Sequence, residues 1–98
     1  MTYDIESSIR YIQDNLSEQD LLAQLAEECT ELAKACLKRI RALNGTNPTP
    51  VSLAETRMSI VEEIADVQLS KLALGMTYNE DIITSKAHRW ENRLRESK

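Results

Sequence analysis

Apolar residues recur along the chain at the spacing of amphipathic helices. A short first helix is predicted by four residues that keep the helical period: Ile5, Ile9, Ile12 and Leu16. A long second helix is predicted by a stripe with alternating spacings of three and four: Leu22, Leu25, Cys29, Leu32, Cys36, Ile40 and Leu43. A further helix near the end of the chain is predicted by Ile83, Ala87, Trp90 and Leu94. No strand pattern competes with these helices, so the predicted fold class is all-α.

Start and stop signals set the limits of these helices. Ser17 and Ser52 each precede an acidic residue by three positions, which is the pattern of a capping box at a helix start. Asn79 is a candidate cap for the last helix. The segment LNGTNPTPVS (43–52) carries a glycine and two prolines and therefore ends the second helix. A third helix is expected from Ser52 until Gly75, which makes four helices in one domain, 1–98.

The predicted third helix is apolar on two sides. One stripe is Ala54, Met58, Val61, Ala65, Leu69, Leu72 and Met76, and a second stripe at spacing seven is Ile60, Val67 and Leu74. A helix with two apolar sides is usually buried between two layers, so another helix or another subunit is expected on each side. The polar sector between the stripes contains Glu55, Ser59, Glu62, Glu63, Asp66 and Ser70. These carboxylates are therefore expected to face a crevice.

Acidic residues cluster twice, in LAEECTELAK of the second helix and SIVEEIADVQ of the third. Like charges one helical turn apart cost roughly 0.2–0.5 kcal/mol per pair, so a compensating cation is expected. When the two helices fold back on each other, Glu31 reaches the height of Glu63 and Glu28 the height of Asp66. Four carboxylates without a histidine favour Mg²⁺, Mn²⁺ or Ca²⁺.

Two neighbouring glutamates have weaker roles in this hypothesis. Glu62 is a candidate outer-shell or additional metal ligand, with a salt-bridged surface position as the alternative. Glu27 points away from the apolar stripe and is expected to be solvated. For either cluster alone, a solvated acidic face is the alternative explanation. A ferritin-like di-iron site is disfavoured because neither cluster contains a Glu-x-x-His pair.

Composition narrows the class of protein. The 98 residues carry a net charge of −4, which argues against a broad nucleic-acid-binding surface. No apolar run approaches the ~18 residues needed to cross a bilayer, and the N-terminus lacks a leader pattern, so a cytoplasmic location is expected. Cys29 and Cys36 are expected to be reduced thiols in the core. A zinc site is disfavoured because there is no CxxC pair and only one histidine.

The paired motif Glu28-Cys-Thr-Glu31 and Glu63-Ile-Ala-Asp66 resembles the ExxE…ExxD signature of the all-α nucleoside triphosphate pyrophosphatases. Four segments of the sequence are similar to the small MazG-like proteins of bacteria and phages: EECTELAKACLK, NPTPV, VEEIADVQL and KAHRWENRL. The resemblance covers roughly Leu21 to Leu94. Phosphoribosyl-ATP pyrophosphohydrolase and the dimeric dUTP and dCTP pyrophosphatases share the paired motif, so a related pyrophosphatase of one of these kinds is an alternative function.

The resemblance implies a four-helix-type bundle assembled as a dimer or tetramer, with Mg²⁺ held by Glu28, Glu31, Glu63 and Asp66. It implies hydrolysis between the α and β phosphates of a nucleotide, with release of a monophosphate and pyrophosphate. Glu31 and Glu63 are the candidate general bases. The alternative function is a non-catalytic helical oligomer that binds a nucleotide or a protein.

Basic residues suggest where phosphates would bind. Lys86, Arg89 and Arg93 stand at spacings of three and four, where they either contact substrate phosphates or complement the helix dipole. Lys34 and Lys38 are further phosphate candidates. His88 is expected at the surface. The aromatic residues are candidates either for stacking on a base or for filling the core: Tyr3, Tyr11, Tyr78 and Trp90.

Overall fold

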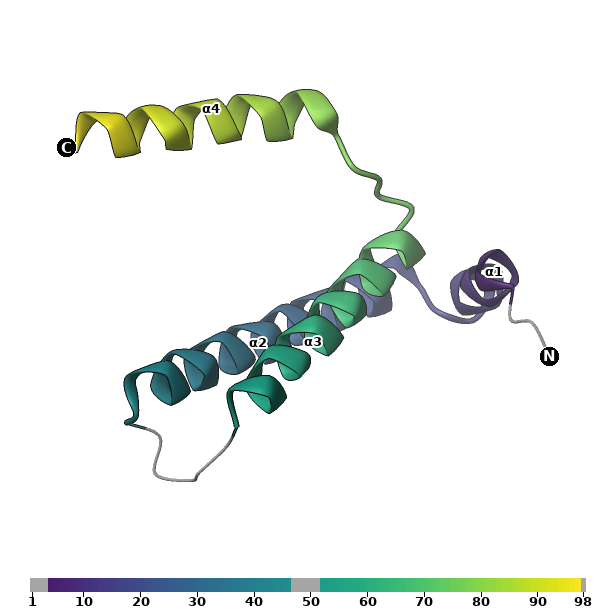
Figure 1. Cartoon of the computed structure of the whole chain (residues 1–98). Coiled ribbons are helices and arrows are strands. Elements are labelled where there is room, and N and C mark those ends of the chain that lie inside the picture. The colour runs from purple at the N-terminus through teal and green to yellow at the C-terminus, as the bar shows by residue number, and fades with distance from the viewer. Residues whose placement is uncertain (1–3, 47–51, 98) are drawn as a thin grey trace.

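The computed structural model describes residues 4–46 and 52–97. Within those residues the chain forms four helices and no strand, which confirms the all-α class (Figure 1). They are α1 (Ile5–Asn15), α2 (Glu18–Asn44), α3 (Leu53–Ala73) and α4 (Glu80–Glu96). Over the same residues, none of these helices combines the length and the apolar character that a membrane span requires.

The helices begin and end at the predicted signals. Ser17 Oγ accepts a hydrogen bond from the backbone N–H of Asp20 at 3.1 Å, and the Asp20 carboxylate accepts one from the Ser17 N–H at 3.1 Å. Asn79 caps α4 by accepting from the Ile82 N–H at 3.0 Å. Gly45 follows α2 with φ 70°, a left-handed conformation that favours glycine. Pro48 and Pro50 lie outside the described residues.

Helices α2 and α3 lie side by side and form a hairpin, as predicted (Figure 1). Near the turn, Arg39 Nη1 donates to the Leu53 carbonyl at 2.6 Å and to Thr56 Oγ1 at 3.1 Å. Thr56 is only 2% exposed, so this arginine ties α2 to the most buried side chain of α3. At the other end, Gln13 Nε2 of α1 donates to the Ala73 carbonyl at 2.9 Å. Side-chain hydrogen bonds to backbone carbonyls therefore join α2 to α3 near the turn and α1 to α3 at the far end of α3.

The face of α3 that packs against α2 carries the second apolar stripe. Ile60, Val67 and Leu74 are half-buried, on the same side as the buried Thr56 and Ser70. The first stripe stays exposed, with Met58 at 55% and Val61 at 51%. In the single chain, α2 covers the side of α3 that carries the second stripe. Burial of the first stripe against another subunit stays a prediction.

The two cysteines are free but exposed, so their assignment to the core is wrong. The less exposed positions of α2 recur at spacings of four and three: Leu21, Leu25, Glu28, Leu32, Ala35, Arg39 and Ala42. Two of them, Glu28 and Ala35, each precede a cysteine by one residue. One residue turns the helix by about 100°, which carries Cys29 and Cys36 away from α3. They lie on an outward apolar strip with exposed Leu22 and Leu43.

Helix α4 stands apart from the hairpin. In the part of the chain that the structure describes, it is in contact with none of the other three helices (Figure 1). Its apolar face is accordingly exposed, with Trp90 at 64% and Leu94 at 55%. One chain therefore brings three of its four helices into contact and does not complete a four-helix packing.

Candidate metal centre

Three carboxylates converge where α2 and α3 lie side by side. Glu28 comes from α2, and Glu63 and Asp66 come from adjacent turns of α3. One carboxylate oxygen from each lies within 4.8 Å of the others. Glu28 and Glu63 are half-buried and Asp66 is exposed, so the cluster opens to solvent on the Asp66 side. The hairpin thus unites residues from the two acidic segments that are 35 or more positions apart in the sequence.

Glu31 lies outside this group of three. Its carboxylate accepts from Lys34 Nζ at 3.4 Å, one turn along the same helix. Glu31 still lies close enough to Glu63 for its negative charge to raise the pKa of that residue. The four carboxylates predicted to converge are therefore divided into three that meet and one that stands beside them with a lysine partner.

The surroundings of Glu63 raise the pKa of its carboxyl group. Its partial burial raises its pKa above the ordinary 4.5, and the negative charges of Asp66, Glu28, Glu31 and Glu62 raise it further. Both causes disfavour the ionised carboxylate. A bound cation would act in the opposite direction, since it attracts the ionised form. Glu62 is exposed and contributes charge without joining the group of three.

Gln24 supports the cluster from α2 and was missed in the sequence. Its Nε2 donates to Glu28 Oε1 at 2.7 Å, one helical turn along. A glutamine four positions before a glutamate was the available signal, because residues at that spacing are neighbours on a helix. The bond restrains the carboxylate of Glu28 while leaving its other oxygen for a ligand.

The donor set fits a hard divalent cation. All three groups offer carboxylate oxygen, and no histidine or cysteine belongs to the group. Mg²⁺ and Mn²⁺ prefer such ligands, and Mg²⁺ is commonly held by a few carboxylates together with water and phosphate oxygens. The open Asp66 side leaves room for those additional oxygens.

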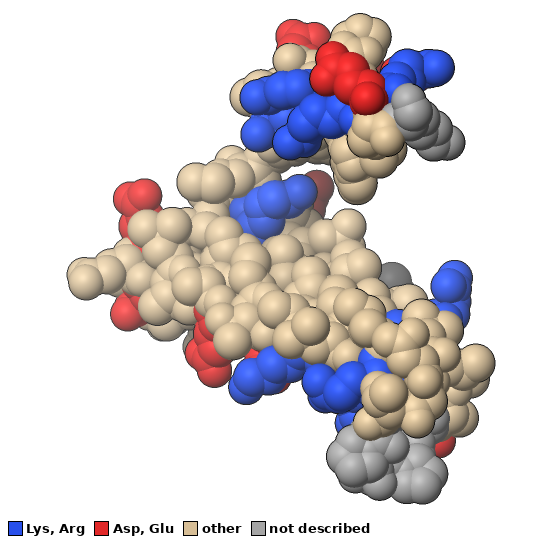
Figure 2. All heavy atoms as spheres, turned by 90° about the vertical axis from the view of Figure 1, so that its left-hand side faces the viewer, with Lys and Arg blue, Asp and Glu red and all other residues tan. Residues whose placement is uncertain are grey.

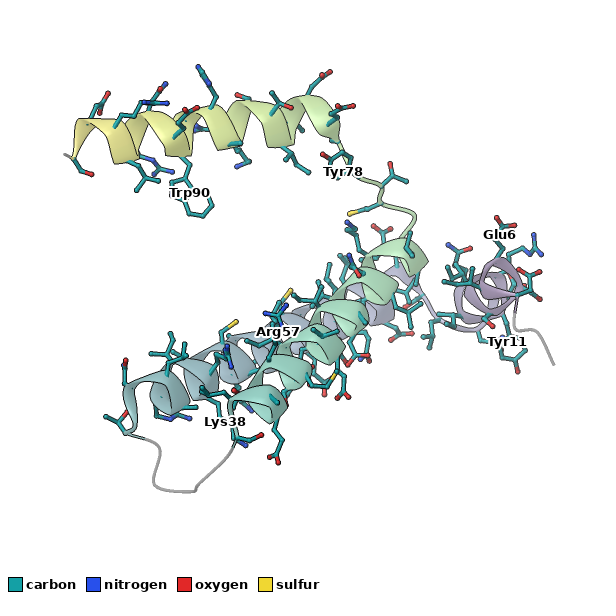
Figure 3. The ribbon with its side chains drawn as sticks, viewed as in Figure 1. Glu6, Tyr11, Lys38, Arg57, Tyr78 and Trp90 are labelled. Atoms are coloured by element: carbon teal, nitrogen blue, oxygen red, sulfur yellow. The ribbon has the colours of Figure 1, made fainter. Side chains whose placement is uncertain are left out.

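The predicted phosphate-binding residues of α4 are not gathered around the carboxylates in one chain. Lys34 is paired with Glu31, and Lys38 is exposed on the turn-proximal half of α2 (Figure 3). Lys86, Arg89 and Arg93 are exposed on α4, which does not contact the hairpin. Figure 2 shows several Lys and Arg side chains close together on α4 and others on the surface of the hairpin.

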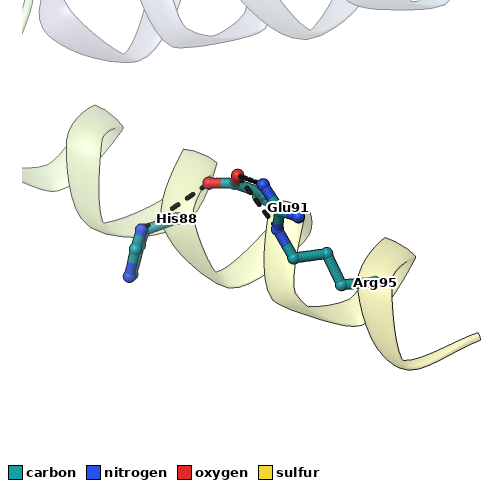
Figure 4. Close-up of polar contacts among 3 residues, drawn as sticks. All are labelled: His88, Glu91 and Arg95. Atoms are coloured by element: carbon teal, nitrogen blue, oxygen red, sulfur yellow. Dashed lines mark hydrogen bonds and ion pairs between the residues drawn. The ribbon is translucent and has the colours of Figure 1, made fainter.

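The end of α4 carries its own ion pairs. Glu91 accepts from Arg95 Nη2 at 2.6 Å and from Arg95 Nε at 3.2 Å, and His88 Nδ1 lies 3.8 Å from Glu91 (Figure 4). The His88 side chain is 73% exposed, which confirms the predicted surface position. These contacts join neighbouring turns of one helix, so they stabilise α4 without linking it to the carboxylates.

The aromatic residues lie away from the cluster. Tyr11, Tyr78 and Trp90 are all exposed, and each projects from the surface of its segment (Figure 3). Tyr3 lies outside the described residues.

No protein-family model, curated protein or solved structure matches this chain. The likeness to MazG-like proteins consequently rests on the sequence motif.

Proposed function

We propose that the protein is a Mg²⁺-dependent nucleotide pyrophosphohydrolase that cleaves a ribo- or deoxynucleoside triphosphate to a monophosphate and pyrophosphate. The observation that carries the proposal is the group of Glu28, Glu63 and Asp66, whose oxygens lie within 4.8 Å in a partly buried position. The raised pKa of Glu63 supports it, because partial burial and then the neighbouring negative charges disfavour its ionised form, and a divalent ion would offset both. Mn²⁺ is the alternative ion.

The residues divide into ligands, a support and a base. Glu28, Glu63 and Asp66 would hold the ion, and Gln24 would keep Glu28 oriented through its 2.7 Å hydrogen bond. When bound, Mg²⁺ supplies positive charge against phosphate oxygens and lowers the pKa of water. Glu31 is the first candidate for general base, since it stands next to the three ligands without belonging to them. Glu63 is the second candidate.

We further propose that the protein works as a dimer or tetramer. Large apolar side chains on both helices of the hairpin are about half exposed in one chain, such as Leu37 at 55% and Met58 at 55%. A chain this short buries little surface by itself, and a second copy would cover these faces. In such an assembly, Lys86, Arg89 and Arg93 of one copy would contact phosphates held at the carboxylates of another.

A non-catalytic oligomer that binds a nucleotide or a protein is the second candidate. The exposed apolar face of α4, with Trp90 and Leu94, favours it, because such a face is typical of a docking surface. This candidate predicts binding without turnover.

Pyrophosphate release separates the two candidates. The full chain is incubated with a panel of ribo- and deoxynucleoside triphosphates in Mg²⁺, in Mn²⁺ and in EDTA. Metal-dependent release of pyrophosphate from at least one nucleotide is the expected result. Binding of a nucleotide with no release under any of the three conditions would refute the enzymatic proposal.

A further inference from the structure

A cavity of about 260 Å³ opens directly beside the carboxylates, between the end of α1 and the hairpin. Its floor includes three of the best-buried side chains of the described chain: Leu21, Ser70 and Ala73. Ile12 and Leu69 add apolar walls. The hydrogen bond from Gln13 to the Ala73 carbonyl joins α1 to α3 at this place, so the cavity is formed by restrained elements.

The cavity changes in chemical character along its length. Its lining is mainly apolar, but Glu28 and Asp66 also belong to it, so one end is shared with the candidate metal centre. A matching ligand has a compact, largely apolar portion joined to an anionic portion that approaches a cation. The volume lies below the roughly 300–1,000 Å³ of sites that enclose a whole drug-sized ligand. It therefore suits part of a nucleotide rather than all of it.

Two polar residues belong to the lining, the exposed Gln24 and the buried Ser70. Gln24 donates one N–H to Glu28, and no hydrogen bond among the described residues uses its second N–H or its Oε1. Ser70 is 8% exposed and donates its hydroxyl to the Asp66 carbonyl at 3.0 Å, which leaves its oxygen able to accept. Few polar groups in an apolar site determine orientation and specificity.

We propose that this cavity receives the heterocyclic base of the nucleotide, with its phosphates at the Glu28 and Asp66 end, and that Gln24 reads the hydrogen-bonding edge of the base. The inference rests on the proposed function for the identity of the ligand. It explains base binding without aromatic stacking, since the cavity is lined by aliphatic side chains. It also makes Gln24 a shared contact, because the same amide restrains Glu28.

The test compares ligands with and without a base. Affinities of the full chain are measured in Mn²⁺ for the deoxynucleoside 5′-monophosphates and for 2-deoxyribose 5-phosphate, which lacks the base. Burying about 60 Å² of apolar base surface corresponds to roughly tenfold in affinity, so at least one monophosphate should bind about tenfold more tightly. Equal affinity of the sugar phosphate and every monophosphate would overturn the inference.

Two matched leucines provide the variants. Leu69 lines the cavity and is 41% exposed, whereas Leu72 on the same helix does not line it and is 40% exposed. Leu69→Trp should abolish the affinity advantage that the base confers, and Leu72→Trp should retain it. Equal losses in the two variants would assign the effect to the exposed stripe and overturn the inference.

Gln24→Met keeps an unbranched side chain of similar length and removes the amide. It should reduce discrimination among the bases, and an unchanged ranking would overturn the role of Gln24. It also serves as the second variant if Leu69→Trp fails to fold, as judged by circular dichroism.

Binding of Mn²⁺ alone separates this inference from the proposed function. Mn²⁺ binding without any advantage from the base refutes the cavity and leaves the metal centre intact. A base-dependent advantage that persists in a protein unable to bind Mn²⁺ refutes the metal chemistry and leaves the cavity intact.

Discussion

Replacing Glu63 with glutamine tests the central part of the hypothesis. Glu63 is one of three carboxylates whose oxygens lie within 4.8 Å, and partial burial together with four acidic neighbours raises its pKa. The amide has nearly the same shape as the carboxylate but removes one negative charge and one strong ligand. We therefore expect Glu63→Gln to weaken metal binding while the metal-free protein melts no lower than the native one.

The size of the effect follows from linkage. An ion that binds only the folded state, present at ten times its Kd, adds about 1.4 kcal/mol to the free energy of unfolding. For a chain of this length that corresponds to a rise in Tm of roughly 6–11 °C. The native protein should show this rise in Mg²⁺, and Glu63→Gln should lose most of it. Loss of a ligand or base should also lower kcat by roughly 10²–10⁴-fold.

The matched control is Glu27→Gln, one residue from Glu28 on α2. Glu27 is exposed and does not belong to the group of three, although the substitution changes the net charge by the same amount. Melting curves are recorded for the three proteins across a Mg²⁺ titration, together with pyrophosphate release. Glu27→Gln should behave like the native protein in both assays.

Two results would refute the reasoning. A native Tm that is indifferent to Mg²⁺ would mean that the three carboxylates do not form a metal site. Small and equal effects of Glu63→Gln and Glu27→Gln would mean that the cluster is an ordinary charged surface.

Three further outcomes are expected. The raised pKa of Glu63 means that the folded state binds more protons above pH 4.5, so metal-free native protein should lose stability as pH rises through the folded pKa. Melting curves of the native protein and Glu63→Gln from pH 4 to 8 check this, and identical pH dependence would contradict it. Arg39→Met removes two hydrogen bonds between α2 and α3 and should lower the free energy of unfolding by about 1.5–3 kcal/mol in urea titrations. Arg57 is exposed (Figure 3), so the control Arg57→Met should lower the free energy of unfolding by less than about 0.5 kcal/mol. Met58→Glu introduces a charge on the exposed stripe and should shift a dimer or tetramer toward monomer, which light scattering measures as a lower molar mass. An unchanged molar mass would show that the stripe is not part of a subunit interface.

The helices were predictable from the sequence because their signals are local. Ser17, Ser52 and Asn79 bond to backbone groups within three residues, and Gly45 adopts its left-handed conformation at the end of the same helix. The hairpin followed from the short connection, and it accounts for the meeting of the two acidic segments. Local periodicity and charge were therefore sufficient for the fold class and for the approximate position of the cluster.

The rotation of each helix about its axis was not predictable in this way. Cys29 and Leu25 belong to one plausible stripe, yet packing against α3 selects Leu25 and Glu28 and turns Cys29 outward. The same rotation brings Glu28 to Glu63 and Asp66 and leaves Glu31 with Lys34. It also creates the cavity beside Gln24, which joins residues from three segments.

Sequence by itself determined where the helices begin and end and that two acidic clusters face each other across a hairpin. The tertiary structure decided which carboxylates meet, which apolar stripe is covered and that α4 stays apart. The physical reason is the range of the interactions. Caps and turns are satisfied within a few residues, whereas helix rotation depends on the packing of side chains from distant segments, such as Arg39 on Thr56 and Gln13 on Ala73.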